Sequence, residues 1–343
     1  MIAKCLVFAF LPLLLCGETP YREALPGYSY RFPRDYFEHR DFRTEWWYYT
    51  GNVRTTGGKR YGFELVFFRQ GQRRGPSDNP SAWRVDDLYL AHAALTDIDG
   101  KHFLYHERLN RSGPGIAGAS FEERRIWNGN WSDRWLGESQ LLEVTTEDFR
   151  FRLRLTPVKP VIIQGENGVS QKAAGAGKAS CYVSFPRLQV QGEIDGQTVQ
   201  GTAWMDHEWF TNQLADSQRG WDWFSVQLDN GTEFMLFQLR RKDGTIDPYS
   251  SGTYVDRSGR AHHLKAADFS LEPLERWRVY PIRWRIGIPS LGVSLEAKAA
   301  LPDQVLELKT GPSYWEGAVR YSGSATGSGY LEMTGYEKPV RLE

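Results

Sequence analysis

The stretch Phe149-Arg150-Phe151-Arg152-Leu153-Arg154-Leu155-Thr156 decides the fold class of this chain. Its apolar side chains alternate strictly with arginines and a threonine, and a period of two puts the two kinds on opposite faces of an extended backbone. One apolar face and one cationic face are typical of an antiparallel sheet with a core on one side and water on the other. We therefore expect residues 149–156 to form a half-buried antiparallel strand.

Further strand patterns recur on both sides of this stretch, separated by short turn signals. Helix patterns are scarce, because no long stretch spaces apolar residues by three and four without an intervening Gly or Pro. An Asp, Asn or Ser followed by Gly supplies the positive backbone φ that tight hairpins need. Such pairs occur at Asp99-Gly100, Asp195-Gly196, Asn230-Gly231, Asp243-Gly244 and Ser258-Gly259. The sequence therefore predicts an all-β protein whose strands are mostly joined by hairpins.

The length of the chain predicts two domains. Its 343 residues exceed the roughly 250 residues that one β domain commonly reaches. Residues 210–219 show no apolar period, so we place the boundary there and expect domains over residues 27–210 and 220–343. Residues 164–180 are rich in Gly, Ala, Lys and Ser and predict a mobile surface loop. An inert loop is favoured over one that covers a ligand site.

The composition excludes one class of partner. Lys plus Arg and Asp plus Glu each number 42, so the chain has no net charge with which to attract phosphates or an anionic bilayer. We expect no nucleic-acid partner. The 13 Trp, 17 Tyr and 18 Phe residues fill β cores in one interpretation and line a pocket for an apolar ligand in the other.

The N-terminus predicts export. Over residues 1–17, Lys4 precedes an apolar run from Cys5 to Cys16 that is too short to span a bilayer, the layout of a signal peptide. We expect a periplasmic or secreted protein. In the alternative, a lipoprotein signal leaves Cys16 lipidated, and this anchor is then the protein's contact with a membrane. At most two of the three cysteines remain after processing, so no disulfide framework is expected.

Three segments combine carboxyl groups with indole rings. They contain Glu45 and Trp46, then Trp204 and Asp206, then Asp222 and Trp223. A carboxyl group among Trp side chains loses solvation, which raises its pKa and keeps it protonated for general-acid work. Aromatic faces beside it stabilise a developing carbocation. The combination favours protonation of an alkene followed by capture with water. In the alternative, each acid only hydrogen-bonds a backbone group or an Arg at a sheet edge.

If residues 204–209 form an extended strand, alternation determines which side chains of the central segment share a face. Trp204, Asp206 and Glu208 then share one face, and His207 lies on the other. Asp206 and Glu208 would form a carboxylate pair that divides acid and base roles. His207 is a candidate base or relay, with a structural hydrogen-bonding role as the alternative.

His92 lies between small apolar residues and is expected to be buried, either facing a ligand cavity or satisfied within the core. The sequence has neither the ligand spacing of a closed zinc site nor a phosphate-binding Gly-rich loop, so we expect no metal and no cofactor. Metal dependence is conceivable only through a grouping of Glu45, Asp206, His207 and Glu208.

Separated motifs in a fixed order also resemble a known family. They are FPRD (32–35) with EWWYYTG (45–51), GTAWMDHEW (201–209), GWDWFS (220–225), and YWEGAV (314–319) with GYLEMTGY (329–336). On these motifs the chain is similar to the AttH-like family, which is related to carotenoid 1,2-hydratase. The resemblance implies two consecutive lipocalin-like β-barrel domains with a ligand site near their junction. The family includes hydratases of isoprenoid double bonds, and Met205 and Glu208 depart from that branch toward the exported proteins called secreted hydrolases.

The leading hypothesis is an exported, cofactor-independent hydratase- or hydrolase-like enzyme that acts on an apolar, terpenoid-like molecule. Asp206 is expected to be the principal acid and His207 a relay, with Glu45 and Asp222 as supporting carboxylates. The expected ligand-binding residues are Trp46, Trp204, Trp223, His92 and Glu208.

The alternative hypothesis is a non-catalytic, lipocalin-like carrier of a hydrophobic ligand, in which the same aromatics bind and the acids hold the domain junction. A buried carboxyl group with a raised pKa that faces a cavity favours the enzyme. Acids that all pair with Arg around a closed apolar pocket favour the carrier.

Overall fold

The computed structural model describes residues 20–75 and 78–340. The expected signal peptide, with Cys5 and the alternative lipidation site Cys16, lies outside these residues. Within them nearly all regular structure is β, and the helices are single 3-10 turns, η1 (Arg34–Tyr36), η2 (Ala266–Asp268) and η3 (Pro289–Leu291). The predicted all-β class is confirmed. In this part of the chain we find no helix with the length and apolarity needed to cross a membrane.

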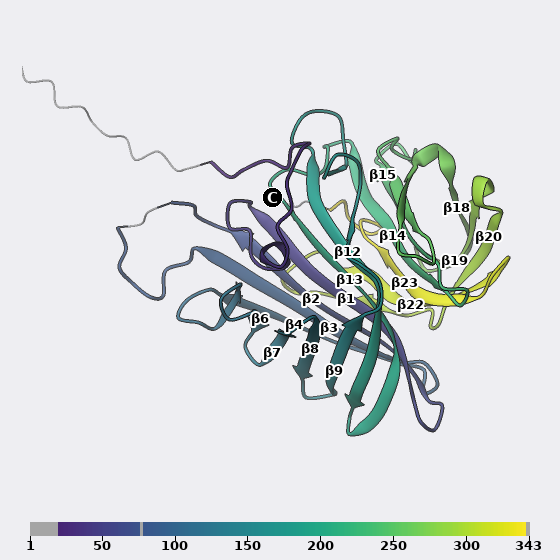
Figure 1. Cartoon of the computed structure of the whole chain (residues 1–343), viewed down its shortest axis with the longest axis horizontal. Coiled ribbons are helices and arrows are strands. Elements are labelled where there is room, and N and C mark those ends of the chain that lie inside the picture. The colour runs from purple at the N-terminus through teal and green to yellow at the C-terminus, as the bar shows by residue number, and fades with distance from the viewer. Residues whose placement is uncertain (1–19, 76–77, 341–343) are drawn as a thin grey trace, which may run out of the picture.

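The first sheet has thirteen strands and curls into a nearly closed barrel (Figure 1). Its order is β4-β3-β2-β1-β13-β12-β9-β8-β7-β6-β5, with β10 and β11 paired to β12. The strands are β1 (Thr44–Thr55), β2 (Arg60–Gly71), β3 (Asp87–Asp97), β4 (His102–Arg111), β5 (Ala117–Ser120), β6 (Arg125–Asn128), β7 (Trp131–Leu136), β8 (Ser139–Thr145), β9 (Arg150–Pro157), β10 (Ile162–Ile163), β11 (Ser170–Gln171), β12 (Ala179–Ile194) and β13 (Gln197–Phe210).

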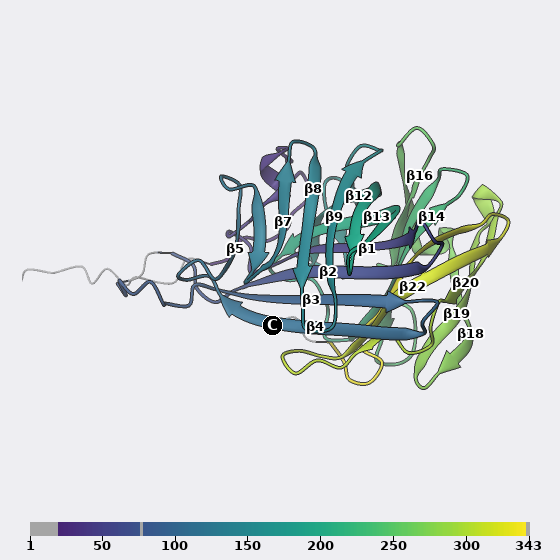
Figure 2. The same ribbon diagram turned by 90° about the horizontal axis from the view of Figure 1, so that it is seen from below.

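The second sheet has ten strands and begins after a short connection from β13. Its order is β17-β16-β15-β14-β23-β22-β20-β19-β18, with β21 paired to β22. The strands are β14 (Gln218–Leu228), β15 (Glu233–Arg241), β16 (Ser251–Val255), β17 (Ala261–Lys265), β18 (Ser270–Trp277), β19 (Tyr280–Ile288), β20 (Val293–Ala299), β21 (Val305–Leu306), β22 (Tyr314–Gly323) and β23 (Gly327–Met333). Figure 2 shows this sheet beside the first, and β22 and β23 contact β2 and β1.

The stretch at 149–156 folds as its alternation predicts. In β9, Phe151, Leu153 and Leu155 are buried, whereas the intervening arginines are exposed. Four of the five predicted turns place Gly at positive φ. At Asp99-Gly100 the left-handed residue is instead Lys101, with φ of 60°. A Cβ atom at Gly100 would lie 2.5 Å from the Asp97 carboxylate, so that side chain would have to move to admit another residue.

Apolar side chains form a core inside each barrel and a third cluster between the barrels. The first core contains Trp47 and Phe67, and the second contains Phe224 and Leu236. The neighbouring positions on the same strands, such as Tyr48 and Trp223, belong to the cluster between the barrels. The period of two therefore gives these strands two apolar faces, one for their own barrel and one for the junction.

A buried ion cluster fixes the two sheets relative to each other. Glu233 on β15 is fully buried, and its carboxylate accepts hydrogen bonds from Lys159 Nζ and Arg187 Nε, each at 2.5 Å. Both cations belong to the first sheet's part of the chain. Asn52 on β1 also donates to the backbone carbonyl of Gly329 on β23 at 3.1 Å. The surface between the barrels is therefore held by polar as well as apolar contacts.

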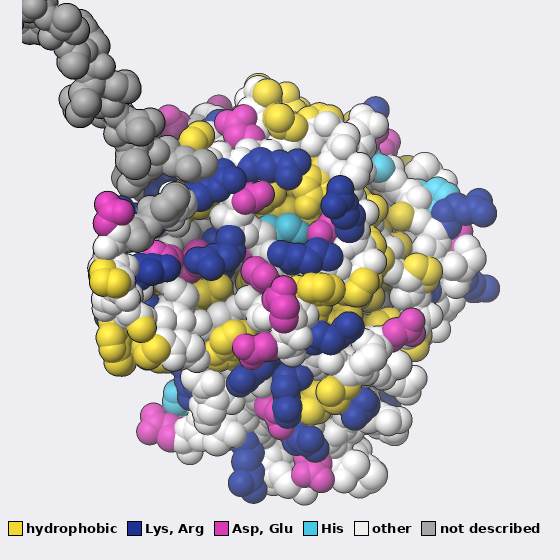
Figure 3. All heavy atoms as spheres, turned by 60° about the vertical axis from the view of Figure 1, so that its left-hand side comes forward, with side chains coloured by type: hydrophobic (Ala, Val, Ile, Leu, Met, Phe, Trp, Pro, Cys, Tyr) yellow, Lys and Arg dark blue, Asp and Glu magenta, His cyan; other side chains and the backbone are white. Residues whose placement is uncertain are grey.

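The surface mixes charges of both signs. Figure 3 shows one face, on which Lys and Arg side chains are interspersed with Asp and Glu side chains. This distribution agrees with the equal numbers of acidic and basic residues in the sequence.

Candidate functional site

A cavity of about 320 Å³ lies between the two sheets. One wall comes from β1, β2, β3, β12 and β13, and the other from β14, β15, β22 and β23. Residues 308 and 310–313, between β21 and β22, also contact it. The volume falls in the range of roughly 300–1,000 Å³ that is usual for small-molecule sites. Aromatic side chains that include Trp46, Phe68, Trp223 and Phe237 make the walls largely apolar.

Asp206 lies on the cavity wall in β13 and is 3% exposed. Its Oδ1 accepts hydrogen bonds from Ser184 Oγ at 2.5 Å and Trp204 Nε1 at 2.6 Å, and its Oδ2 accepts one from the Tyr182 hydroxyl at 2.5 Å. These donors favour the carboxylate, but burial outweighs them and raises the pKa of Asp206 to about 7. Both protonation states are therefore populated near neutral pH, as an efficient general acid requires.

Two further carboxyl groups line the cavity from the second sheet. Glu316 on β22 and Glu332 on β23 are direct cross-strand partners, so their charged forms repel each other. Burial and then neighbouring acids raise the pKa of Glu316 well above its usual range, and burial raises the pKa of Glu332 to about 7. Tyr48, opposite Asp206 in the register of β1 and β13, donates its hydroxyl proton to Glu316. Tyr48 thus connects the two walls.

His92 lines the cavity from β3 and is buried. Its Nδ1 lies 2.8 Å from the Tyr314 hydroxyl, which donates to Glu64 Oε1 at 3.0 Å. Burial lowers the pKa of His92 to about 4, so the ring is neutral at pH 7. The tautomer that matches a Tyr314 hydroxyl donating to Glu64 has Nδ1–H donating to Tyr314 and a lone pair on Nε2. Among the described residues this Nε2 has no hydrogen-bond partner.

Glu208 lies two residues from Asp206 on the same face of β13 and also lines the cavity. Its Oε1 accepts hydrogen bonds from Ser180 Oγ and from Gln213 Nε2, the latter at 2.7 Å, and lies 3.4 Å from Lys172 Nζ. Asp206 has only neutral donors, whereas Glu208 has an ammonium group. Asp206 and Glu208, the carboxylate pair that the alternation predicts, therefore line one cavity, and each has a different environment.

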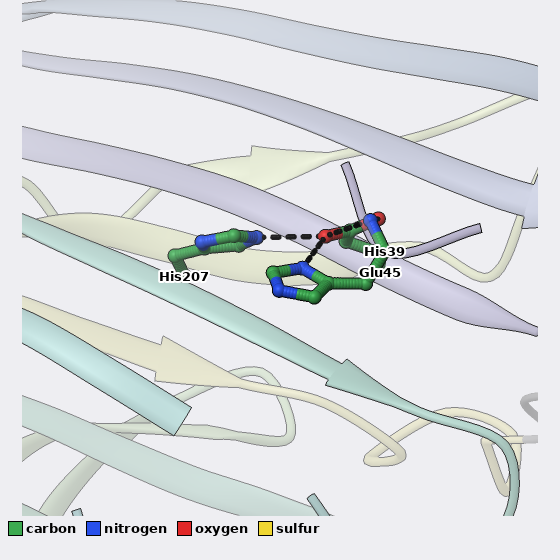
Figure 4. A group of neighbouring side chains, drawn as sticks. All are labelled: His39, Glu45 and His207. Atoms are coloured by element: carbon green, nitrogen blue, oxygen red, sulfur yellow. Dashed lines mark hydrogen bonds and ion pairs between the residues drawn. The ribbon is translucent and has the colours of Figure 1, made fainter. Parts of the chain in front are cut away.

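Glu45 on β1 and His207 on β13 lie on the face of the sheet opposite to Asp206 and Glu208. Figure 4 shows both side chains together with His39. Glu45 Oε1 accepts hydrogen bonds from His207 Nε2 at 2.9 Å and from His39 Nδ1 at 2.7 Å. Fully buried Arg69 donates from Nε to Glu45 Oε2 at 3.1 Å. Neither Glu45 nor His207 lines the cavity. The expected grouping with Asp206 fails because adjacent residues of a strand point to opposite faces.

The nitrogen and oxygen atoms of His39, Glu45 and His207 lie within 4.8 Å of one another, close enough to hold a metal ion. Both imidazole rings already hydrogen-bond to Glu45 Oε1, however. A divalent cation would replace both imidazole protons on Glu45 and lie beside the guanidinium of Arg69. We therefore interpret the group as a hydrogen-bonded tie between the segment before β1 and strands β1, β2 and β13. Within residues 20–75 and 78–340 one more such group occurs, largely exposed: His106, Glu147 and Asp148.

Asp222 is buried but also lies away from the cavity lining. Its Oδ2 accepts hydrogen bonds from Gln238 Nε2 at 2.8 Å and Arg240 Nε at 3.1 Å. Burial raises the pKa of Asp222, and Arg240 opposes that rise. Of the carboxylates predicted to be catalytic, Asp206 is therefore the one that faces the cavity.

The predicted aromatic wall is largely assembled. Trp46 and Trp223 line the cavity. Trp204 is 1% exposed and packs edge-to-face on Trp223, with ring centroids 6.2 Å apart, while its Nε1 holds Asp206. Trp204 is thus a support for the acid rather than a ligand contact.

Several cavity residues were not predicted: Tyr48, Tyr182, Lys172, Tyr314, Glu316 and Glu332. Alternation from Trp46 would have found Tyr48, because residues two apart share a face. Lys172 lies in the segment expected to be an inert loop. That expectation is wrong, because residues 170–171 form β11 against β12 and the next side chain reaches the cavity.

Two curled antiparallel sheets with an acidic, aromatic cavity between them define a two-barrel protein with a small-molecule-sized site at the junction. The chain belongs to the AttH-like family, whose model matches residues 23–336. No curated protein sequence gives a significant match.

Solved structures show the same architecture. A protein described as AttH from Nitrosomonas europaea is 34% identical, with a TM-score of 0.82, and the match covers 92% of this chain and 99% of that one. Kievitone hydratase from Nectria haematococca is 15% identical, with a TM-score of 0.67 and coverage of 94% and 98%. CghA, solved with Sch210972, is 14% identical, with a TM-score of 0.50 and coverage of 85% and 88%. The two more distant likenesses establish the fold alone.

Proposed function

We propose that the protein is a cofactor-independent, hydratase-type enzyme that adds water to a double bond of an apolar, terpenoid-like small molecule. The observation that carries this proposal is Asp206, a buried acid with a pKa raised to about 7 on the wall of an aromatic cavity. Among the described residues no Arg or Lys forms an ion pair with it. The fold shared with kievitone hydratase supports the same reaction class.

Asp206 acts first, as the proton donor. The π electrons of the alkene take its carboxyl proton to form a new C–H bond, which leaves a carbocation at the more substituted carbon. The faces of Trp46 and Trp223 stabilise this cation through their quadrupoles. The Asp206 carboxylate that forms is stabilised by its three hydrogen-bond donors, which interact more strongly with the charged group than with the neutral one.

His92 completes the addition. Its Nε2 lone pair accepts a hydrogen bond from a water molecule, whose oxygen attacks the carbocation to form the C–O bond. The proton that this oxygen loses passes to His92, and exchange with solvent returns a proton to Asp206. The net reaction adds one water molecule and consumes no cofactor.

The carrier hypothesis accounts less well for this arrangement. It expects acids paired with Arg around the ligand space. Glu45 and Asp222 do pair with Arg69 and Arg240, but neither acid lines the cavity. The acids at the cavity face it without an Arg partner, a costly arrangement for a site that only has to be apolar.

The test begins with native mass spectrometry of the protein from its native host, followed by extraction of any retained molecule. That molecule, and limonene as a defined terpenoid alkene, are then incubated with the protein in H₂¹⁸O. We expect ¹⁸O-labelled alcohol from wild type and at least a 100-fold loss in Asp206→Asn, the usual size of a general-acid contribution. Asp303→Asn, an exposed change outside the cavity, should retain full turnover. Retention without labelling would support the carrier, and unchanged turnover in Asp206→Asn would remove Asp206 from the mechanism.

We also propose that the protein acts outside the cytoplasm, on the strength of Lys4 and the apolar run that follows it. It is either free after cleavage of the signal or anchored through a lipid on Cys16. Mass spectrometry of the N-terminal peptide from an envelope fraction distinguishes these forms, and an intact N-terminus in the cytosol would contradict both.

A further inference from the structure

Lys172 is a cation inside the cavity whose donors are largely unused. Its side chain is 6% exposed, and its Nζ has one carboxylate neighbour, Glu208, at 3.4 Å. That distance exceeds the roughly 2.7–2.9 Å of a charge-assisted hydrogen bond. The same Nζ lies 3.9 Å from the ring centroid of Phe237 and 5.2 Å from that of Tyr182. An ammonium group has three N–H donors, and neither a ring face nor one long contact uses all of them.

The position of Lys172 is fixed by its backbone rather than left to a flexible loop. Its amide nitrogen donates to Lys178 O at 2.9 Å, and its carbonyl accepts a hydrogen bond from Gln218 Nε2 at 2.7 Å. Gln218 begins β14 of the second sheet, so both barrels hold this residue. Such a placement is typical of a binding group and is unnecessary for a surface lysine.

A comparison with Arg69, the other cation that contacts the cavity, shows what sets Lys172 apart. Arg69 directs Nε to Glu45, Nη1 to Asp87 and Nη2 to two backbone carbonyls, so its donors are satisfied by protein. Lys172 is the cation at the cavity, within the described residues, that retains donors for a ligand.

We propose that Lys172 forms a subsite for a neutral carbonyl oxygen of the substrate, so that the substrate is an apolar ketone or aldehyde that also carries the reacting double bond. This inference rests on the proposed function and deepens it. A carbonyl oxygen accepts hydrogen bonds, as the ammonium requires. A carboxylate or phosphate would instead bring a second anion to an ammonium group that already has the Glu208 carboxylate as its neighbour.

The geometry also sets the spacing within the substrate. Asp206 and Glu208 are two residues apart on β13, which separates them by roughly 7 Å along the strand. Lys172 lies beside Glu208 rather than beside Asp206. The carbonyl oxygen of the substrate therefore lies several bonds from the carbon that Asp206 protonates. Burial lowers the pKa of Lys172, and Glu208 opposes this effect by favouring the ammonium form.

Carvone and limonene test the proposal because they share a carbon skeleton and an isopropenyl group, and carvone adds a ketone. Isothermal titration calorimetry should show that wild type binds carvone about tenfold more tightly than limonene, the factor to which one charge-assisted hydrogen bond corresponds. Lys172→Met should abolish this preference and leave limonene affinity unchanged. Lys178→Met is the matched control, since Lys178 Nζ contacts Asn212 and the Leu214 carbonyl instead of the cavity.

The variant is expected to fold, because Glu208 keeps its hydrogen bonds from Ser180 and Gln213. The preference of wild type needs no variant and is a test by itself. Wild type that binds carvone no better than limonene, or that binds neither, would refute the carbonyl subsite. So would equal weakening of both probes in Lys172→Met. Hydration of limonene by the same wild-type protein would leave the proposed function intact, so the two failures are distinguishable.

Discussion

The raised pKa of Asp206 should make the protein less stable as pH rises, and Asp206→Asn should remove that effect. Burial raises this pKa from 3.8 to about 7, so between these values the folded state holds a proton that the unfolded state has lost. The unfolding free energy therefore falls with increasing pH across this window. At 1.36 kcal/mol per pKa unit, the contribution of Asp206 between pH 4.5 and 8 is about 3 kcal/mol.

Urea denaturation followed by tryptophan fluorescence measures this difference. We expect the unfolding free energy of wild type to fall by about 3 kcal/mol more than that of Asp206→Asn when the pH is raised from 4.5 to 8. Asp303→Asn should show the wild-type pH dependence, because its side chain is exposed and lies away from the cavity. Parallel profiles for wild type and Asp206→Asn would show that the carboxyl group is ionised throughout, and the reasoning from burial would be wrong.

Two further predictions concern the surroundings of Asp206 and of Glu45. Ser184→Ala removes a hydrogen-bond donor that favours the ionised form of Asp206. Such a bond contributes about 1.5 kcal/mol, so the basic limb of the pH profile of kcat/KM should move up by about one pH unit. Ser170→Ala is the control and should leave this limb in place, because Ser170 is a buried serine whose Oγ has no partner among the described residues. Glu45→Gln should lower the unfolding free energy by about 3 kcal/mol, because buried Arg69 loses a carboxylate. Calorimetric carvone affinity should stay unchanged in Glu45→Gln, and a loss of affinity without a loss of stability would contradict the structural role.

The fold could be predicted further than the site because it depends on patterns that repeat. Alternation at 149–156 and the Gly turns indicate half-buried strands and hairpins, and each such signal is local. Lys101 shows the limit of this reasoning, since the positive φ of its hairpin lies one residue beyond the expected glycine. The closure of two sheets and their packing against each other depend on contacts between distant strands, which no local pattern contains.

The site was predicted where alternation was applied and missed where it was not. Applied to 204–209, it placed Asp206 and Glu208 together and His207 apart. The same rule separates Glu45 from Trp46, so the cluster of an acid with indoles in sequence was not a cluster in space. Glu316 shares a cavity with Asp206 only across the junction of the barrels, and Lys172 reaches Glu208 only because β11 pairs with β12. Their arrival depends on the packing of the second sheet and of β11, and the sequence shows neither.

The two apolar faces of the junction strands have a consequence for how such proteins can diversify. On β1, β13 and β14, positions that shape the ligand space alternate with positions that fill a barrel, so the two sets of residues do not overlap. A mutational library restricted to the cavity-facing set would change binding preference while leaving both hydrophobic interiors untouched. The architecture is therefore well suited as a starting point for directed evolution of new substrate ranges.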